Sequence, residues 1–316
     1  MLSGASLRDW IFCTLTGFGL FVLGSIMPVL ALPLMLLYPS PGIYIAYSAG
    51  VRAAAASVVC SSLLILLVLP PVFSALYLLM FGLSGLLIGT LARRVEQSGD
   101  FLLLAIFISL MFKILVYLVT FRITGLNLLT PDPAMVESAV LAFADSRLSL
   151  LSGGDLAHLK ENIAQTVNYF IVLVPYGIVA FSAAEVLLSC SLASLLSGKR
   201  GGKRFFRLPP LGSWSFPKNI LLALVVGVIC EMIASANPEY VLMRQLGVNL
   251  SAVARTLFII QGLAVTYCLM ERRAFPKFAR IAMIIATPII PLLSDIFSIV
   301  GIVDLGFNLR KRLKGE

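Results

Sequence analysis

The sequence predicts an all-α protein, a polytopic bundle of transmembrane helices with about eight to nine membrane segments. Hydrophobic residues make up 59% of the 316-residue chain, charged residues make up only 12%, and the mean hydropathy is +1.01. A soluble domain carries about 25% charged residues, so too few polar side chains remain here to cover a surface that faces water. Uncharged apolar runs of about 20 residues, the length that spans a bilayer, recur along the chain. These observations exclude a soluble enzyme held by a single anchor.

The apolar segments divide into two groups on either side of a basic stretch. We expect a six-helix membrane unit over residues 1–197 and a three-segment membrane unit with a basic tail over residues 219–316. Residues 198–218, rich in glycine, lysine and arginine, have the composition of a cytoplasmic linker. The expected segments, in chain order, are 10–28, 30–50, 53–69, 72–92, 101–121, 166–196, 219–235, 250–270 and 281–305.

Prolines predict breaks in two of these segments. Pro33, Pro39 and Pro41 interrupt segment 30–50, so we expect a short helix, a loop and a second short helix there. Irregular backbone at membrane depth is tolerated where it is buried in protein or lines a cavity, so this break points to a site. Pro288 and Pro291 fall inside segment 281–305, which we expect to be broken or re-entrant, with the basic tail inside.

The basic residues predict the orientation. With the N-terminus in the cytoplasm, fourteen lysines and arginines up to residue 280 fall in inner segments. Those in outer segments are Arg122, Arg147, Lys160, Arg244 and Arg255. This distribution follows the positive-inside rule, so we expect a multi-pass protein of the bacterial inner membrane with a cytoplasmic N-terminus and a retained first helix. Because topology explains the net charge of +9, the bilayer is the expected partner and nucleic acid is not.

The longest outer loop, residues 122–165, carries helix-start signals of its own. Asp132 precedes Pro133 and is expected to cap a helix that begins with this proline. Asp155 follows a pair of glycines and can cap the helix that continues into segment 166–196. We expect this loop to lie on the outer surface or to fold over the bundle as a lid.

The sequence contains no motif that is typical of catalysis, cofactor binding or metal binding. The five cysteines lie inside apolar runs without a CxxC spacing and are expected to be packing residues. His158 is the only histidine, which excludes metal sites that need several imidazoles. No nucleophile–base pair or phosphate-binding loop is present, so we expect no catalytic residue, no cofactor and no metal, and the protein is not expected to be an enzyme.

Ionisable and strongly polar residues inside the membrane segments are the first candidates for a site, because each is costly in a bilayer. At 1.5 Å per residue they lie about 14–21 Å from the inner helix ends, which predicts one polar layer near the midplane. The members of this layer are Lys113, Glu185, Glu231, Gln261 and Asp295. In one interpretation, Lys113 and Glu185 only pair and fix how two helices meet. In the other, the layer forms a cavity that binds a small solute or relays protons, and the surplus of acids favours it.

A second candidate set lies near the outer ends of helices five and six. It consists of Tyr117, Arg122, Asn168, Tyr169 and Tyr176. These side chains suit a solute site on the outer side of the membrane. The alternative is that the tyrosines are interface anchors, the commoner role of tyrosine at that depth.

The C-terminal third carries a set of short motifs. They are Leu208-Pro209-Pro210, Trp214, Pro217-Lys218, Ile260-Gln261-Gly262-Leu263-Ala264-Val265, Arg272-Arg273, Pro276-Lys277 and Ile302-Val303-Asp304-Leu305-Gly306-Phe307. With these motifs the chain resembles the YybS-like family of bacterial multi-pass membrane proteins, a domain of unknown function. The resemblance covers nearly the whole chain and implies little about activity.

A looser resemblance covers residues 10–196. Residues 47–54 lead into one helix, and residues 81–89 lead to Arg93 and Arg94, an order similar to the S-components of energy-coupling-factor vitamin transporters. That resemblance implies six helices with both ends inside and the binding of a small solute. The first helix lacks the pair of alanines four residues apart with which S-components dock, and the segments after residue 196 are foreign to them. Gly82, Gly85 and Gly89 are equally explained as a plain packing face.

Two functions follow as hypotheses. The first is a membrane protein that binds or transports a small solute with an S-component-like core, alone or with partner subunits. The alternative is a non-transporting scaffold or assembly factor of the cell envelope, which contacts a membrane or cytoplasmic protein partner through residues 197–218 and the basic tail. An intramembrane enzyme is a third hypothesis, for which no catalytic pair is found.

Overall fold

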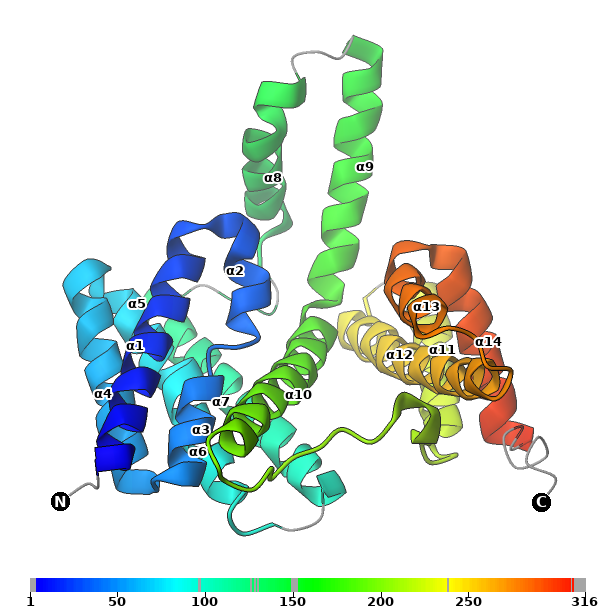
Figure 1. Ribbon diagram of the computed structural model, residues 1–316. Helices are drawn as coiled ribbons and strands as arrows, with labels where there is room; N and C mark the ends of the chain where they lie inside the picture. The colour runs from blue at the N-terminus through cyan, green and yellow to red at the C-terminus, as the bar shows by residue number, and fades with distance from the viewer. Residues whose placement is uncertain are drawn as a thin grey trace. The chain divides into compact units, whose positions relative to one another are not determined.

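The computed structural model is all-helical over the residues it describes, which are 4–95, 98–125, 127, 129, 131–148, 153–237, 239–307 and 309. The helices form two compact units, which are described separately (Figure 1). Unit 1 comprises Met1–Leu128 and Ile178–Leu208, and unit 2 comprises Leu129–Gly177 and Pro209–Glu316. In this division residues 129–177 group with the C-terminal helices, although the sequence suggests a six-helix unit over 1–197.

Unit 1 is a bundle built from the N-terminal helices and most of α10. Its elements are α1 (Gly4–Ile26), α2 (Pro28–Met35), α3 (Ser40–Ser48), α4 (Val51–Val68), α5 (Pro71–Leu76), the π-helix η1 (Tyr77–Gly82), α6 (Leu83–Leu91), α7 (Ser98–Thr124) and α10 (Val174–Lys199). The predicted break in segment 30–50 is confirmed, since α2 and α3 are two short helices joined by a turn. Pro33 lies inside α2, and Pro41 lies in the first turn of α3, where its missing N–H costs nothing.

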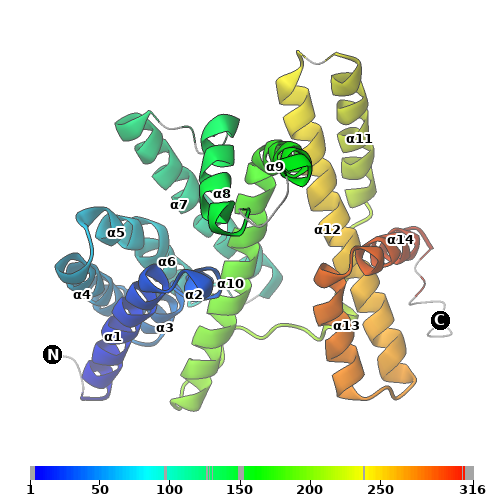
Figure 2. The same ribbon diagram turned by 90° about the horizontal axis from the view of Figure 1, so that it is seen from above.

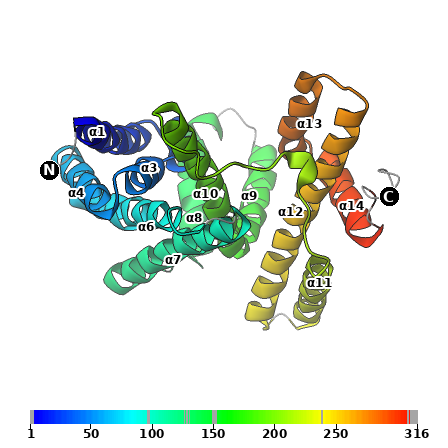
Figure 3. The same cartoon turned by 60° about the horizontal axis from the view of Figure 1, so that its bottom comes forward.

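Helix α3 packs closely against α6, as Figure 3 shows. A side chain at Gly85 or Gly89 would meet the backbone of Pro39 or Ile43, so only glycine allows the two helices to approach this far. The interpretation of these glycines as a packing face is therefore confirmed. Beside this contact, the aromatic rings of Phe21, Tyr38, Tyr77 and Phe81 form a second core cluster.

Unit 2 contains the helices of residues 129–177 and the C-terminal helices. Its elements are α8 (Pro133–Leu148), α9 (Gly153–Val172), the 3-10 turn η2 (Leu211–Ser213), α11 (Ile220–Ala236), α12 (Val241–Arg272), α13 (Lys277–Ile289) and α14 (Pro291–Phe307). Figure 2 shows α11 and α12 as an antiparallel hairpin. Helix α14 packs on α12, where Gly262 and Gly301 each face a backbone carbonyl of the other helix.

Two boundaries differ from the sequence-based prediction. The span expected at 166–196 begins only at Val174. Helix α9 ends at Val172, Leu173 is not helical, and Pro175 lies in the first turn of the next helix. The span expected at 250–270 begins at Val241, so Arg244 lies inside the same helix as Arg255. Asn249 can lie inside this helix because its amide donates to the Val172 carbonyl and accepts from the Tyr176 N–H.

Other expectations agree with the structure or fall outside it. Asp132 caps α8 by accepting from the Ala134 N–H at 3.0 Å, as predicted. Helix α9 already begins at Gly153, so Asp155 lies inside it and is not its cap. The break near Pro291 is confirmed, with α13 and α14 bent by 107°. The basic tail at 310–314 lies outside the described residues.

The described helices are long and apolar enough for a multi-pass membrane protein. Seven could cross a bilayer, and the bent pair α13–α14 brings the number to eight. Helix α11 is apolar but shorter, at 17 residues. The predicted all-α membrane fold is confirmed, and the expected eight to nine segments are reached when the bent pair and α11 are counted.

Candidate functional site

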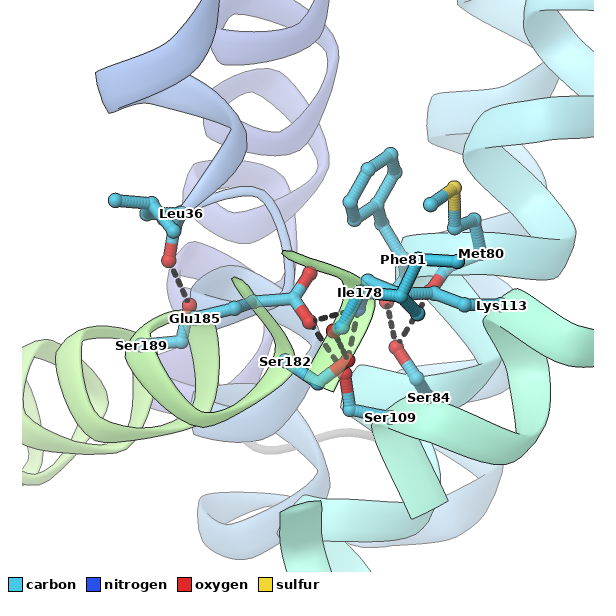
Figure 4. Close-up of polar contacts among 10 residues, drawn as sticks. All are labelled: Leu36, Met80, Phe81, Ser84, Ser109, Lys113, Ile178, Ser182, Glu185 and Ser189. Carbon is cyan, nitrogen blue, oxygen red and sulfur yellow. Dashed lines mark hydrogen bonds and ion pairs between the residues drawn. The ribbon is translucent and has the colours of Figure 1, made fainter. Parts of the chain in front are cut away.

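A buried ion pair joins two membrane helices of unit 1. Lys113 of α7 and Glu185 of α10 point toward one another, with 2.5 Å between the lysine Nζ and the glutamate Oε2 (Figure 4). Their side chains are only 5% and 1% exposed. Ser109, one turn before Lys113, accepts from Nζ at 2.7 Å and donates to the same carboxylate oxygen. The direct contact predicted between Lys113 and Glu185 is confirmed.

The surroundings of this pair are tightly packed. The Phe181 ring lies 5.4 Å from Lys113 Nζ, within the range of a cation–π interaction. One turn beyond Glu185, Ser189 donates to the Leu36 carbonyl at 2.7 Å and ties α10 to the chain after α2 (Figure 4). The second oxygen of Glu185, Oε1, has no hydrogen-bond partner within the part of the chain that is described. The arrangement fastens α7 to α10 and suits a structural role.

Another ion pair lies where α10 ends. Arg200 pairs with Asp9 of α1, which also accepts from the Tyr44 hydroxyl at 3.0 Å. The Arg200 guanidinium lies 4.3 Å from the centre of the Phe12 ring. Burial lowers the pKa of Arg200, but the hydrogen bond and the charge of Asp9 more than offset it, so the pKa lies above its ordinary value. Arg200 therefore stays charged and holds the start of α1 to the end of α10.

The segment expected as a linker is packed rather than free. Ser194 donates to the Phe206 carbonyl and accepts from the Phe206 N–H, and Phe206 is buried in unit 1. Further on, within unit 2, the Phe216 N–H donates to the side chain of Gln261 at 3.1 Å. Lys203, Arg204 and Arg207, on either side of Phe206 in the sequence, are exposed.

Unit 2 contains a half-open cavity of about 480 Å³. Its walls come from α9, the first turn of α10, α11, α12 and α14. The polar lining residues are Tyr169, Tyr176, Glu231, Ser251, Arg255, Thr256 and Ser298. Aliphatic side chains and Phe258 supply the remainder of the wall.

The polar groups of this cavity are held in place by short contacts. Glu231 Oε1 accepts from the Ser251 hydroxyl at 2.6 Å. The Tyr176 hydroxyl shares a hydrogen bond of 2.8 Å with Thr256. Arg255 pairs with Asp295, and the two side chains are 59% and 52% exposed. The cavity thus offers an acid, a guanidinium and tyrosine rings to a molecule that enters it.

The predicted polar layer separates into distinct contacts. Lys113 and Glu185 belong to the clasp of unit 1, and Glu231 lines the cavity of unit 2. Asp295 reaches the cavity only through Arg255. Gln261 is buried elsewhere in unit 2, where its Nε2 donates to Asp304 Oδ2 at 2.5 Å.

The predicted outer set separates in the same way. Tyr169 and Tyr176 line the cavity of unit 2. Asn168 donates to the Ala164 carbonyl of its own helix at 2.9 Å. In unit 1, Tyr117 donates to Asn127 at 3.0 Å, and Arg122 is exposed in the last turn of α7.

Sequence reasoning missed several polar residues that take part in these sites, among them Ser109, Ser251, Arg255, Thr256 and Asp304. Ser109 precedes Lys113 by one helical turn, a spacing that could have indicated the contact. Arg255 was expected in an outer segment, and Asp304 appeared only as part of a motif. Among the described residues, no group of three His, Cys, Asp or Glu side chains could hold a metal ion.

Comparisons with known proteins agree with the membrane fold. A family described as "Predicted membrane protein (DUF2232)" matches residues 18–305. The chain is similar to "Uncharacterized protein YybS" of Bacillus subtilis (strain 168), with 19% identity over 233 residues. That alignment covers 73% of this chain and 74% of the relative. No solved structure matches the chain.

Proposed function

The chain belongs to the DUF2232 family of predicted membrane proteins, and from this premise we propose that it binds a small solute in the half-open cavity of unit 2. The solute is taken up by this protein alone or together with partner subunits. The role is one of binding, not of catalysis. The multi-pass membrane fold is the setting for this proposal, and the cavity is the observation that carries it.

Size and chemistry both favour a solute site. The volume of about 480 Å³ lies within the range of about 300–1,000 Å³ that is common for small-molecule sites. Such sites are mostly apolar with a few fixed polar groups, and this cavity combines aliphatic walls with Glu231, Arg255 and Tyr176. Ionisable residues in membrane segments mark solute pathways or pair with one another. Glu231 belongs to none of the ion pairs within the described residues and contacts a cavity large enough for a ligand, which favours the first role.

The comparison with unit 1 favours a site in unit 2. In an S-component-like core the solute would be expected within the N-terminal helices. There the charged groups Lys113 and Glu185 are in contact with each other and almost fully buried. Their charges are used to join α7 to α10, which leaves the cavity residues of unit 2 as the better ligand groups.

Binding is tested by thermal unfolding of the purified protein in detergent with cationic, anionic and neutral solutes. A ligand that binds only the folded state increases the free energy of unfolding, by about 2.7 kcal/mol at a concentration of 100 Kd. The melting temperature rises as a result. Ala252→Trp fills the cavity and should abolish the shift. Leu246→Trp, at an exposed position of the same helix outside the lining, should leave it unchanged. If no solute of any charge gives a shift that Ala252→Trp removes, the proposal is wrong.

We further propose the bacterial inner membrane as the location, with a cytoplasmic N-terminus, on the basis of the positive-inside rule. Single cysteines at Ser138 and Lys203, both exposed, test the orientation in a chain whose five native cysteines are replaced. A membrane-impermeant thiol reagent should label the first in intact cells and the second only after permeabilisation. The reverse pattern contradicts the orientation.

A scaffold function remains the second candidate because of the exposed basic groups near Phe206. Lys203, Arg204 and Arg207 project from a segment that Phe206 and Ser194 fix to unit 1, an arrangement that suits an acidic partner protein. Replacing the three basic residues with glutamine should then remove a co-purifying protein and leave solute-induced stabilisation intact. Loss of solute binding in this variant would contradict a separate scaffold surface.

A further inference from the structure

We propose that the cavity of unit 2 takes a small organic cation, with Glu231 as its counter-ion and the aromatic side chains as its walls. This inference rests on the proposed solute-binding function and names the chemical class of the solute. It follows from the charges, the helix packing and the lining of the cavity.

The two charged residues that line the cavity, Arg255 and Glu231, differ in whether they have a charged partner. The guanidinium of Arg255 already has a partner in Asp295. Glu231 accepts from the neutral hydroxyl of Ser251, and none of the ion pairs within the described residues includes it. A carboxylate in a membrane segment is stabilised by a positive partner. A cationic ligand supplies the missing charge, whereas an anion would have to displace Asp295 from Arg255 and would meet the charge of Glu231.

The packing of α11 on α12 fixes the orientation of this carboxylate. Gly227 of α11 faces Ser251 and the Gly247 carbonyl, while Gly247 of α12 faces the backbone and the Cγ of Glu231. A side chain at either glycine would push the helices apart. Because they approach this closely, Ser251 reaches Glu231 Oε1 and holds the carboxylate. Ser251 is thus a positioning residue, and the second oxygen of Glu231 is the acceptor proposed for the ligand.

Aromatic side chains supply a second feature that suits a cation. Tyr169 and Tyr176 line the same cavity as Glu231. The faces of such rings attract ammonium groups, most strongly where water is excluded. Thr256 fixes the hydroxyl of Tyr176, which restrains its ring. A bare metal ion fits less well, since the volume of about 480 Å³ far exceeds one ion and the walls are largely apolar.

Matched probes test the charge of the ligand directly. Choline is compared with 3,3-dimethyl-1-butanol, in which a neutral carbon replaces the charged nitrogen, and with the 3,3-dimethylbutanoate anion. Butylammonium and 1-butanol form a second matched pair for an unbranched cation. Binding to the full chain in lipid nanodiscs is measured by thermal shift and by isothermal titration. We expect at least one cation to bind, with an affinity at least about tenfold above that of its neutral partner.

Variants of the protein locate the effect. Glu231→Gln keeps the acceptor for Ser251 but removes the charge, so it should weaken cation binding at least about tenfold and leave the neutral partner unaffected. Glu239→Gln, the same change at an exposed position outside the lining, should bind like the unmodified chain. If Glu231→Gln does not fold, the comparison of charged and neutral probes on the unmodified chain still decides the question.

The outcomes separate this inference from the proposed function. If neutral or anionic probes bind in a way that Ala252→Trp abolishes and cations bind no better, the inference is overturned and the solute site stands. Cation binding that Glu231→Gln leaves unchanged also overturns it. If no probe of any charge binds the cavity, both the inference and the proposed function fail.

Discussion

In unit 1 the lysine and the glutamate inside the membrane helices contact each other and are almost fully buried, whereas in unit 2 charged residues line a half-open cavity. Lys113 and Glu185 are 5% and 1% exposed, and Arg255 and Asp295 are 59% and 52% exposed. Both pairs join a basic to an acidic side chain, but the pair in unit 1 is buried and the pair in unit 2 is exposed. An intramembrane charge is therefore a guide to function only when its burial and its partner are known.

The largest expected effect concerns the buried pair. Lys113→Met or Glu185→Gln leaves the other polar group buried without its ion-pair partner, so each should lower the free energy of unfolding by about 3–5 kcal/mol. The double variant should regain part of this loss because neither charge is then isolated. Unfolding by a denaturing detergent in mixed micelles measures all three. Losses that simply add in the double variant would mean that the two residues do not interact.

A smaller effect is expected for a buried amide in unit 2. Gln261→Leu keeps the volume but removes the hydrogen bonds to the Phe216 N–H and to Asp304. The free energy of unfolding should fall by about 1–3 kcal/mol, the cost of leaving a buried polar group unsatisfied. Gln245→Leu, on the same helix but outside this contact, is the control for the change in polarity. Equal behaviour of the two variants would show that the contact contributes nothing.

The smallest effect is expected for the exposed pair. Because Arg255 and Asp295 are more than half exposed, Arg255→Gln and Asp295→Asn should each change the free energy of unfolding by less than about 1 kcal/mol. The same unfolding measurement allows direct comparison with Lys113→Met. A loss as large as that of the buried pair would mean that this pair is also a structural clasp, and the difference between the units would disappear.

Composition and the positions of prolines were sufficient to predict most of the fold. The apolar runs located the membrane helices, and Pro33 and Pro291 marked segments that are broken in the structure. The predicted start of α12 was wrong because the first turns of this helix carry polar residues, Arg244, Gln245 and Asn249, which are typical of a loop. The side-chain amide of Asn249 forms hydrogen bonds with the backbone of Val172 and Tyr176. The spacing of residues along the chain does not predict such a tertiary contact.

The candidate sites could be predicted only in part, because they also depend on tertiary contacts. Equal depth on consecutive membrane helices predicted the contact between Lys113 and Glu185. Depth alone placed Glu231, Gln261 and Asp295 in one layer, yet their partners are Ser251, Asp304 and Arg255, respectively. Which face of a helix meets which neighbour depends on close contacts such as that of Gly227 with Gly247. Such contacts are set by three-dimensional packing and not by hydropathy.

The accessibility of two cysteines to water tests the central difference between the units most directly. Ala252 lines the cavity of unit 2, and Ser182, in α10 near Glu185, is fully buried in unit 1. Each is replaced by cysteine in a chain without native cysteines and treated with a charged, water-soluble methanethiosulfonate, which reacts with the ionised thiol. We predict rapid modification at position 252 and none at position 182 until the protein is unfolded. Equal reactivity at the two positions, or protection of position 252, would contradict the account.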